Sequence, residues 1–448
     1  MSQWDNPLAQ KNALMVFRNS RITVMGLGHF GGGAAAARWL SAQGAIVTVT
    51  DLADEQVLAS ALESLAGTPI AAFHLGGHRE ADFQQADLVV VNPAVRPGNP
   101  WLAIARQNGV PLTTEIDLFL AACPSVAIGV TGSNGKSTTT AMIVAILQAG
   151  GRRAWLGGNI GGSLLDQLPE IRADDIVVLE LSSFQLSYLR PETPLPHIGV
   201  VTSFSPNHLD WHADMDEYAK AKQILLLRQR PDDLAVLNTL DRRLVAWAHN
   251  VHRRVLPLVH CDELPPLALP GWHNRMNAAC AATAALGAGC SRKAIDCGLQ
   301  SFRGLPQRMQ RIAEIDGRTF FNDSTSTTPE STIAALESVR QPAWLLVGGH
   351  DKGFDFTEMI EAIGRLTVGA AFFGQMGRKL HERLTASHVD SCSIAVSTLA
   401  DALNWCWPRS QPGDAIVLSP GCSSHDQFRN FRERGQQFDE LVGRLTVP

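Results

Sequence analysis

The stretch GVTGSNGKSTTT, residues 129–140, joins an apolar run to a helical pattern through a glycine-containing loop. Residues 127–131 are predicted to form a strand, residues 132–135 a loop and residues 136–150 a helix. Backbone N–H groups at the start of a helix can hold anionic oxygens, and a lysine or serine there can reach a phosphate or its magnesium ion. Val130 stands where the general phosphate loop has its first glycine, so the match is imperfect. The strand and helix around the loop favour an ATP site over a chance glycine turn.

The alternation of strand and helix patterns continues along most of the chain. Short runs rich in β-branched residues predict strands at residues 21–26, 45–51, 87–93, 126–132, 175–182, 198–205, 343–349, 370–374 and 414–420. Because these runs are almost wholly apolar, we expect parallel sheets covered on both faces. The sequence therefore predicts an α/β protein with three domains: an N-terminal Rossmann-like domain, a central ATPase-like domain with a phosphate loop and a parallel sheet, and a C-terminal Rossmann-like domain. The predicted boundaries are residues 1–113, 114–304 and 305–448.

The size and composition of the chain narrow the class of protein. Its 448 residues are too many for one hydrophobic core, and 45% apolar with 18% charged residues is typical of a globular protein. A net charge of −5 gives no sign of a nucleic-acid surface. The sequence contains no CxxC pair, no signal-peptide pattern and no run of 18 apolar residues. We expect a cytoplasmic enzyme that binds neither nucleic acid nor a membrane.

Another glycine turn, GLGHFG (residues 26–31), follows the first predicted strand and is the first glycine turn along the chain. Gly26, Gly28 and Gly31 have the spacing of the dinucleotide fingerprint, and Asp51 ends the next predicted strand. On these residues alone, an NAD-dependent dehydrogenase is a reasonable interpretation. A turn that binds nothing and a site for another nucleotide, such as a UDP-sugar, are the alternatives, because a diphosphate also suits a helix N-terminus.

Three further segments carry candidate site residues, and those of two segments are candidate metal ligands. Glu180 ends an apolar strand, where parallel sheets bind ligands, and is a candidate Mg²⁺ ligand. His208 and His212 are four residues apart and could share a helix face as a zinc pair, although phosphates nearby favour Mg²⁺. Lys220 and Lys222 point to roughly opposite sides of a predicted helix, and from the residues alone two solvated lysines are expected.

Four more segments place polar groups after predicted strands or at a helix start. Asn274 and Asn277 lie at the start of a helical pattern, where both could reach a nucleotide. The other segments are NDSTSTTPE (322–330), the glycine loop GGHDKGFDF (348–356), and LSPGCSSHDQFRNFRERGQQF (418–438). Taken singly, each is more often a cap or a turn than a site. Together they lie where open α/β sheets carry ligands.

In these motifs the chain resembles the Mur ligases, the ATP-dependent amide-bond-forming ligases of peptidoglycan precursor synthesis. TGSNGKST (131–138) and HNRMN (273–277) resemble motifs found across the family. GGNIG (157–161), LELSSFQL (179–186) and LSPGCSSHDQFRNFRERG (418–435) are similar to those of the members that add D-glutamate. The resemblance extends from GLGHFG to RGQQF, nearly the whole chain. It implies a ligase of cell wall biogenesis that joins D-glutamate to UDP-N-acetylmuramoyl-L-alanine.

The resemblance also implies roles for individual residues. ATP contacts are expected from Gly132, Ser133, Asn134, Gly135, Lys136, Ser137, Thr138, Asn274, Arg308 and Asp323. Two Mg²⁺ ions are expected, held by Ser137, Glu180, His208 and a carbamylated Lys222. The catalytic residues implied are Lys136, His208 and Lys222. The first glycine turn then matches a UDP-substrate site, with contacts from Gly28, His29, Phe30, Asp51, Asn92 and Asn159. The amino-acid pocket is expected to contain Thr327, Lys352, Ser424 and Phe431.

Four positions depart from the family's pattern. Thr325 replaces a lysine that is usual in the D-glutamate ligases, and Gln307 stands where a histidine precedes Arg308. Ala53 replaces an arginine, and His425 stands where an apolar residue is common. These departures concern the uridine and glutamate contacts, so a catalytically altered, nucleotide-binding Mur-like protein is an alternative. A folylpolyglutamate synthase is a lesser one, since that family lacks the N-terminal glycine-turn domain.

The implied reaction activates a carboxylate before an amide forms. Phosphoryl transfer from ATP gives an acyl phosphate and ADP, while Mg²⁺ and a lysine hold the charge of the transferred group. The glutamate amine then attacks the carbonyl carbon and phosphate leaves, while His208 stabilises the oxyanion. We expect a monomer whose domains close over the substrates, because an acyl phosphate must be kept from water.

Overall fold

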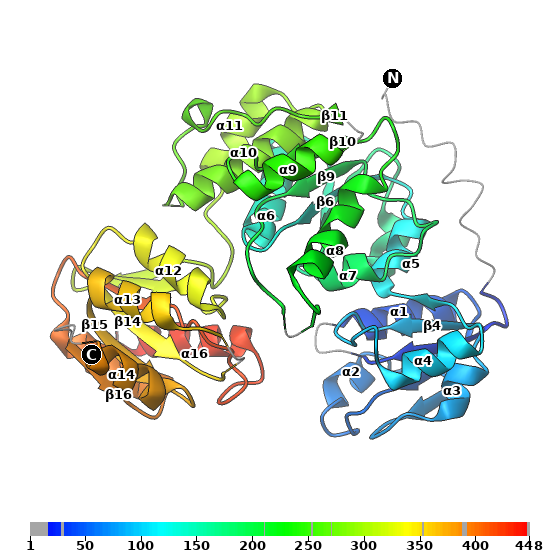
Figure 1. Cartoon of the computed structure of the whole chain (residues 1–448), viewed down its shortest axis with the longest axis horizontal. Coiled ribbons are helices and arrows are strands. Elements are labelled where there is room, and N and C mark those ends of the chain that lie inside the picture. Colours follow the sequence, from blue (N-terminus) through cyan, green and yellow to red (C-terminus); the bar gives the residue numbers. More distant parts are fainter. Residues whose placement is uncertain are drawn as a thin grey trace. The chain divides into compact units, whose positions relative to one another are not determined.

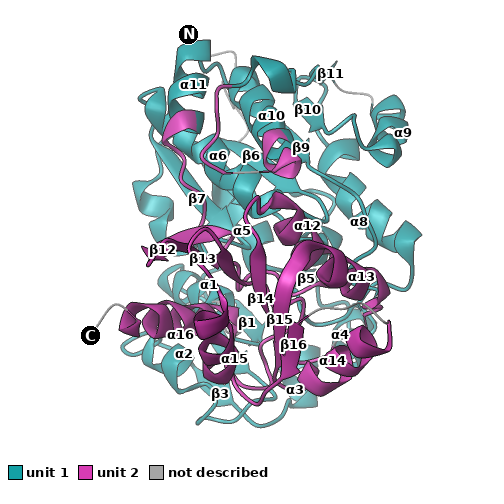
Figure 2. Ribbon diagram, turned by 90° about the vertical axis from the view of Figure 1, so that its left-hand side faces the viewer, with its two compact units in different colours: residues 1–264, 276–299 teal, residues 265–275, 300–448 magenta. Residues whose placement is uncertain are grey.

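The protein is an α/β protein, built from β-sheets with helices around them (Figure 1). The structure, a computed structural model, describes residues 17–27, 31–209, 211–251, 254–269, 271–351, 354–387 and 392–445. The chain forms two compact units, residues 1–264 with 276–299 and residues 265–275 with 300–448, which Figure 2 colours separately. In the described parts of the chain we find no helix whose length and hydropathy would let it cross a membrane.

The first sheet of the first unit is parallel, with strand order β3-β2-β1-β4-β5. Its strands are β1 (Arg21–Met25), β2 (Ile46–Thr50), β3 (Ala72–His74), β4 (Leu88–Val91) and β5 (Leu112–Thr113). The helices of this region are α1 (Gly32–Ala42), α2 (Ala59–Glu63), α3 (Glu80–Gln84), α4 (Pro100–Gln107) and α5 (Glu115–Ala122). A β-carbon on Gly33 would lie 2.3 Å from the Gly26 carbonyl oxygen, so only glycine lets α1 start this close to β1.

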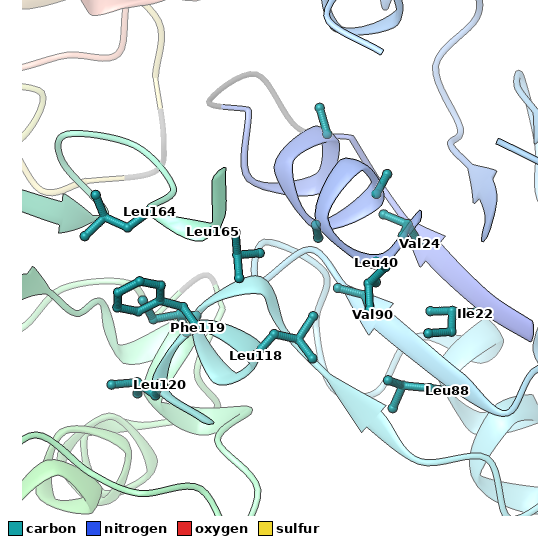
Figure 3. Close-up of a cluster of buried hydrophobic side chains, with 14 of the residues drawn as sticks. Ile22, Val24, Leu40, Leu88, Val90, Leu118, Phe119, Leu120, Leu164 and Leu165 are labelled. Carbon is teal, nitrogen blue, oxygen red and sulfur yellow. The ribbon is translucent and has the colours of Figure 1, made fainter. Parts of the chain in front are cut away.

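Helix α5 packs into a hydrophobic cluster that the first sheet shares with the next one. Its residues Leu118, Phe119 and Leu120 are buried in this cluster (Figure 3). Other members come from both sheets and from the 3₁₀ segment η1 (Leu165–Glu170): Ile22, Val24, Leu88, Val90, Leu164, Leu165, Val177 and Leu179. Because burying one such side chain is worth about 1.5–3 kcal/mol, this cluster holds the two sheets of the first unit together.

The central sheet is also parallel, with strand order β11-β10-β9-β6-β8-β7. Its strands are β6 (Val126–Thr131), β7 (Ala154–Gly158), β8 (Ile176–Glu180), β9 (Ile198–Val201), β10 (Leu234–Leu237) and β11 (Arg254–Val255). The segments between and after them form α6 (Lys136–Ala149), α7 (Ser183–Ser187), α8 (Met215–Leu227), α9 (Arg242–Asn250), η2 (Cys261–Glu263), α10 (Trp272–Gly287) and α11 (Arg292–Ser301). The boundary between the two units falls within α10.

The third sheet lies in the second unit and has the strand order β12-β13-β17-β14-β15-β16. Its strands are β12 (Gln310–Ile315), β13 (Arg318–Asn322), β14 (Ala343–Gly348), β15 (Thr367–Phe373), β16 (Cys392–Ala395) and β17 (Ala415–Leu418). One face packs against α12 (Pro329–Ser338), α13 (Thr357–Leu366) and α14 (Gly377–Ala386). The other packs against α15 (Leu399–Cys406) and α16 (Phe431–Arg444), with η3 (Trp407–Arg409) beside them.

The predicted α/β architecture with three sheets is confirmed, and every strand predicted from the sequence is present. The third sheet differs from a wholly parallel one, because β12 and β13 pair antiparallel. The two strands are joined by Asp316 and Gly317, which both have positive φ, 48° and 74°. This is the Asp-Gly signature of a two-residue hairpin turn. The hairpin was missed because the β12 sequence, QRIAEI, is half polar and does not show the apolar pattern of a central strand.

Candidate active site

The candidate active site lies at the carboxyl edge of the central sheet. There β7, β8, β6 and β9 are neighbours, so the chain segments that leave these strands lie beside one another. Asn159 follows β7, Glu180 ends β8, the glycine loop 132–135 follows β6, and the segment 202–205 follows β9. Residues far apart in the sequence therefore share one edge of the sheet.

The glycine loop and its helix have the conformation predicted from the sequence. α6 begins at Lys136, and Gly135 precedes it with a φ of 83°, a left-handed conformation that glycine adopts without strain. Two hydroxyls of the segment 202–205 donate to the carbonyl oxygen of Asn134, at 2.6 and 3.0 Å. The Ser133 hydroxyl donates to a carbonyl of the same segment at 2.8 Å. These bonds fix the loop, so the N–H groups at the start of α6 keep the directions that suit anion binding.

Two lysine ammonium groups meet at one oxygen of this loop. Lys136 Nζ lies 3.0 Å from the carbonyl oxygen of Gly132 and 2.9 Å from that of Ser133. Lys222 Nζ lies 2.8 Å from the same Gly132 oxygen. Like charges this close repel each other, so the charge of Lys136 disfavours the protonated form of Lys222. Lys136 and the N–H groups at the start of α6 favour an anion beside the loop, which a phosphate chain would provide.

Lys222 is buried, with only 1% of its surface exposed. Its Nζ lies 4.5 Å from the centre of the Tyr218 ring and 3.5 Å from Thr131 Oγ1. Burial, and then the charge of Lys136, hold the pKa of Lys222 well below its ordinary value, although Glu180 opposes this shift. Lys220, two residues before Lys222 on α8, is exposed. The residue-based expectation of two solvated lysines is therefore wrong for Lys222.

Glu180 presents one carboxylate oxygen that has no hydrogen-bond partner among the described residues. The side chain is 1% exposed, and its Oε1 accepts a hydrogen bond of 2.7 Å from Asn159 Nδ2. The Asn159 N–H also donates to the Glu180 carbonyl oxygen at 2.9 Å. Oε2 is buried and accepts no hydrogen bond from the described residues. Because such an oxygen is costly to bury alone, it is suited to a cation that arrives with a ligand.

The two histidines lie in the segment before α8, so the hypothesis that they share a helix face is wrong. His208 has a φ of 56°, which is uncommon outside glycine, and its ring centre lies 4.8 Å from that of Phe184. His212 Nε2 lies 2.9 Å from Ser183 Oγ, so this histidine packs against α7 instead of pairing with His208. In the ranges that the structure describes, no three His, Cys, Asp or Glu side chains form a metal-binding group. A zinc site made of such side chains is not supported.

The donors present nevertheless fit Mg²⁺. This ion is usually held by one or two carboxylates, with waters and phosphate oxygens completing the shell. The open Oε2 of Glu180 supplies the carboxylate, and Ser137, buried in the first turn of α6, supplies a hydroxyl beside the phosphate loop. A set with so few acidic side chains is therefore consistent with a metal that arrives together with a nucleotide.

Two cavities adjoin the first glycine turn. One, of about 340 Å³, is lined by Gly26, Asn92, Glu115, Asn159 and residues near them. The other, of about 280 Å³, contains Asp51 and again Asn92. Gly28, His29 and Phe30, predicted to contact the UDP-substrate, lie outside the described residues. The structure thus brings Asn92 and Asn159, which are 67 positions apart in the chain, to one cavity, and Asp51 to the neighbouring cavity.

Asp51 is committed to the backbone of the turn. Its Oδ2 accepts from the Leu27 N–H and its Oδ1 from the Ala53 N–H, both at 2.9 Å. The departure at Ala53 therefore leaves the backbone contact of Asp51 in place and removes only a longer side chain. His78, which sequence analysis did not single out, lines the same cavity, and its Nδ1 lies 2.7 Å from a strand β2 hydroxyl. Burial lowers the pKa of His78.

Asp323 directly follows β13 in the second unit and is buried. Its Oδ1 accepts a backbone N–H at 2.9 Å, and its Oδ2 accepts the hydroxyls of Ser326 and Ser419 at 2.5 and 2.8 Å. Burial raises the pKa of Asp323 to about 6, although these bonds and the charge of Arg308 lower it. Asn274, in the first turn of α10, is buried in the same unit.

The predicted amino-acid pocket draws on neighbouring strands of the third sheet. Thr327 follows β13, while Ser424 and Phe431 follow β17, and these two strands are adjacent. Lys352 falls outside the described residues. The two segments are tied together, because the Gly421 N–H donates to the carbonyl of residue 326 at 3.0 Å. The structure therefore places the three described pocket residues at the same end of one sheet.

Arg434 on α16 also holds these segments and was missed by the sequence analysis. It is completely buried, and its guanidinium donates to the Ser324 hydroxyl, the Ser324 carbonyl and the Cys422 carbonyl, at 3.1, 2.9 and 3.1 Å. Burial lowers the pKa of Arg434 to about 10. The available signal was its position three residues after Phe431, on the same helix.

Two departures from the family pattern contact each other. The Thr325 hydroxyl and N–H both donate to the Gln307 carbonyl oxygen, at 2.9 and 3.1 Å. Gln307 has a positive φ of 58°, and its side chain donates to the Arg432 carbonyl at 2.9 Å. His425 is exposed. The side chains of Thr325 and Gln307 thus make hydrogen bonds that hold the segments around residues 307 and 325 in place.

A phosphate loop on a parallel sheet, a buried lysine and an open carboxylate oxygen define an ATP-using α/β enzyme. Comparison with known proteins agrees with this class. The model of the Mur ligase MurD-like N-terminal domain matches residues 20–114, that of the Mur ligase middle domain residues 130–264, and that of the Mur ligase glutamate ligase domain residues 307–422. The chain belongs to the Mur ligase family, whose members are ATP-dependent ligases that form amide bonds.

Relatives support this membership, and solved structures share the fold. The chain is 37% identical over 468 residues to the UDP-N-acetylmuramoylalanine–D-glutamate ligase of Roseiflexus sp., with 96% of this chain and 100% of the relative covered. It is 34% identical over 458 residues to the enzyme of that name from Symbiobacterium thermophilum, with 95% and 98% covered. Its fold is similar to the UDP-N-acetylmuramate-alanine ligase MurC of Thermotoga maritima, with a TM-score of 0.63, 18% identity, and 96% and 100% covered. It is also similar to the MurF ligase of Thermotoga maritima in complex with ADP, with a TM-score of 0.59, 16% identity and 97% of each chain covered.

Proposed function

We propose that this chain joins D-glutamate to UDP-N-acetylmuramoyl-L-alanine, converting ATP to ADP and phosphate. The observation that carries the proposal is the meeting of Lys136 and Lys222 at the Gly132 carbonyl, beside a carboxylate with a free oxygen. This arrangement accepts a phosphate chain and its metal at the sheet edge. The choice of substrates is supported by full-length relatives that carry the D-glutamate ligase name. Membership of the Mur ligase family replaces the dehydrogenase interpretation of the first glycine turn.

In the first step, a carboxylate oxygen of the alanyl group attacks the γ-phosphorus of ATP. A P–O bond forms, the bond to the β-phosphate breaks, and ADP leaves. Residues 132–138 hold the phosphates, and Lys136 turns from the loop carbonyls toward the transferred group. Asn274, Arg308 and Asp323 are the proposed nucleotide contacts of the second unit. Asn134 and Ser133, fixed by the segment after β9, keep the loop in place during this step.

Ser137, Glu180, His208 and a carbamylated Lys222 would hold two Mg²⁺ ions. When bound, they would supply positive charge to the oxygens of the transferred phosphoryl group. Carbamylation adds CO₂ to the neutral amine of Lys222 and releases a proton. Burial supports this reaction, because it lowers the pKa of Lys222 and so favours the neutral amine. Asn159 donates to one carboxylate oxygen of Glu180 and thereby leaves the other free.

In the second step, the amine of glutamate, having lost its proton, attacks the carbonyl carbon of the acyl phosphate. A C–N bond forms, the C–O bond to phosphate breaks, and inorganic phosphate leaves. The imidazole of His208 stabilises the oxyanion that forms in between. Thr327, Lys352, Ser424 and Phe431 are proposed to hold the glutamate, and Arg434 fixes two of the segments that carry them.

Domain boundaries at residues 1–113, 114–304 and 305–448 are part of the proposal. They are supported by the three matched family regions and by the three sheets. A monomer and a cytoplasmic location stay predictions. Size-exclusion chromatography with light scattering measures the first, and cell fractionation the second.

The proposed function is tested by phosphate release from purified protein, ATP, Mg²⁺ and UDP-N-acetylmuramoyl-L-alanine, with D-glutamate compared with L-glutamate. We expect release that requires both the UDP-substrate and D-glutamate, and none from a Lys136→Ala preparation. Release that needs neither acceptor would refute ligation. Activity with L-glutamate alone would refute the assigned amino acid and leave the ligase chemistry intact.

A further inference from the structure

One half-buried acidic side chain in the first unit has no part in the chemistry described above. Glu115 is the first residue of α5, and it lines the 340 Å³ cavity together with Gly26, Asn92 and Asn159. It is the one titratable side chain among the described residues that line this cavity. Its position is fixed, because α5 is anchored by the buried cluster that the first and central sheets share (Figure 3). The carboxyl group therefore stays at the cavity wall.

The partners of Glu115 do not compensate a negative charge. Ser163 Oγ donates to Glu115 Oε1 at 2.5 Å, and no ion pair to Glu115 occurs within the described parts of the chain. Burial raises the pKa of Glu115 to about 7, although the bond from Ser163 lowers it and nearby Asp166 raises it further. Near neutral pH, the protonated and ionised forms are therefore both present.

The other charged groups around α5 are already paired. Asp166 on η1 pairs with Arg38 on α1 at 2.6 Å. Asp117 on α5 pairs with Arg190 at 2.6 Å. Toward the central sheet, the carboxylate of Glu180 accepts a hydrogen bond from the side chain of Asn159, which lines the cavity. None of these groups is placed to neutralise Glu115, so its charge depends on the pH and on what enters the cavity.

The rest of the cavity wall suits a diphosphate. Gly26, Gly32 and Gly33 bring the backbone of the glycine turn and the start of α1 to the cavity, and a helix start attracts anions. Gly158 and Gly162 also line the cavity and add no side chain to it. An ionised carboxylate in this wall would repel such a ligand, whereas a protonated carboxyl group would donate a hydrogen bond to it.

We propose that Glu115 is a binding residue for the diphosphate-bearing substrate and that its carboxyl group binds this substrate in the protonated form. The inference rests on the proposed function, because it takes the UDP-substrate as the occupant of the cavity. Binding then requires one proton for every ionised Glu115. Affinity falls by about tenfold for each pH unit above the pKa of the free protein.

The experiment is isothermal titration of the full-length protein with UDP-N-acetylmuramoyl-L-alanine between pH 6 and 8.5. Buffers of different ionisation enthalpy report the number of protons taken up. For the wild type, we expect the dissociation constant to rise about sevenfold from pH 7.3 to 8.3, with close to one proton bound at pH 8. Glu115→Gln keeps a hydrogen-bond donor and should give one affinity at all pH values without proton uptake. Glu63→Gln, an exposed residue of α2, is the matched control and should keep the wild-type profile.

Ser163→Ala provides an independent test. Its hydroxyl stabilises the ionised carboxylate, so its removal should move the fall in affinity to higher pH. This shift decides the matter if Glu115→Gln does not fold. A wild-type profile that is flat, or a Glu115→Gln profile that follows the wild type, overturns the inference. Either result would still show binding of the UDP-substrate, whereas absence of binding at every pH would count against the proposed function itself.

Discussion

Gly135→Ala is the change whose cost the structure specifies best. Gly135 precedes α6 with a φ of 83°, and an alanine in this left-handed conformation is strained by about 1–2 kcal/mol. A β-carbon there would lie 2.2 Å from Asn277 Oδ1, and Asn277 is itself buried. Displacing that amide costs about 1–2 kcal/mol more. We expect a loss of about 2–4 kcal/mol in unfolding free energy, which a protein of ordinary stability survives.

The same change should weaken ATP use. Shifting the loop removes or lengthens a hydrogen bond to a charged phosphate, which is worth about 1.5–3 kcal/mol and corresponds to roughly a 10- to 100-fold fall in kcat/KM for ATP. Gly151→Ala is the matched control. Gly151 also has a positive φ, 74°, but a β-carbon there meets nothing within 4 Å. It should lose only the strain of about 1–2 kcal/mol and keep its kcat/KM.

The measurements are urea unfolding of both variants and phosphate release at varied ATP. Adding Asn277→Ala to Gly135→Ala should recover stability, because the colliding atom is gone, and a double-mutant cycle reports that recovery as a coupling energy. Equal stability losses in Gly135→Ala and Gly151→Ala, together with an unchanged kcat/KM, would refute the reasoning.

Two other predictions concern ionisable groups. Lys222→Ala should lose most of its phosphate release and regain part of it when short-chain carboxylic acids replace the carbamate, while Lys220→Ala, an exposed lysine on the same helix, should stay active; full activity of Lys222→Ala would exclude the carbamate. Because the pKa of Asp323 is raised to about 6 in the native state, the stability that its neutral form provides is present below about pH 4 and is lost as the pH rises through 6. The wild type should therefore lose roughly 3 kcal/mol of unfolding free energy between pH 4 and 7 relative to Asp323→Asn, which does not titrate. Urea unfolding at several pH values measures this difference, and a difference that stays constant with pH would contradict the raised pKa.

The sequence predicted the elements well because their patterns are local. Apolar runs, glycine turns and the Lys136 helix start each lie within a dozen residues, and the strands and helix were found where expected. The missed β12–β13 hairpin shows the limit of apolar patterns, since its best signal was the Asp-Gly pair and not its strands.

The contacts of the site could be predicted only in part because they join distant segments. The bond between Lys222 and the Gly132 carbonyl spans 90 residues, and that between Asn159 and Glu180 spans 21. Neither has a periodic signal. A phosphate loop indicates where ATP binds, but the order of the strands decides which side chains come to that edge. The contact between Tyr218 and Lys222 does have a local signal, because the two residues lie one helical turn apart, although the sequence analysis did not use it.

The buried cluster around α5 has a consequence for how the protein unfolds. The family regions at residues 20–114 and 130–264 contribute side chains to the same hydrophobic core, so neither region has a complete core by itself. Cleavage of the chain after residue 114 would separate Ile22 and Val90 from Leu118 and Phe119 and expose hydrophobic surface on both fragments. The two family regions should therefore unfold as one cooperative unit. Differential scanning calorimetry should show a single transition for the first two sheets.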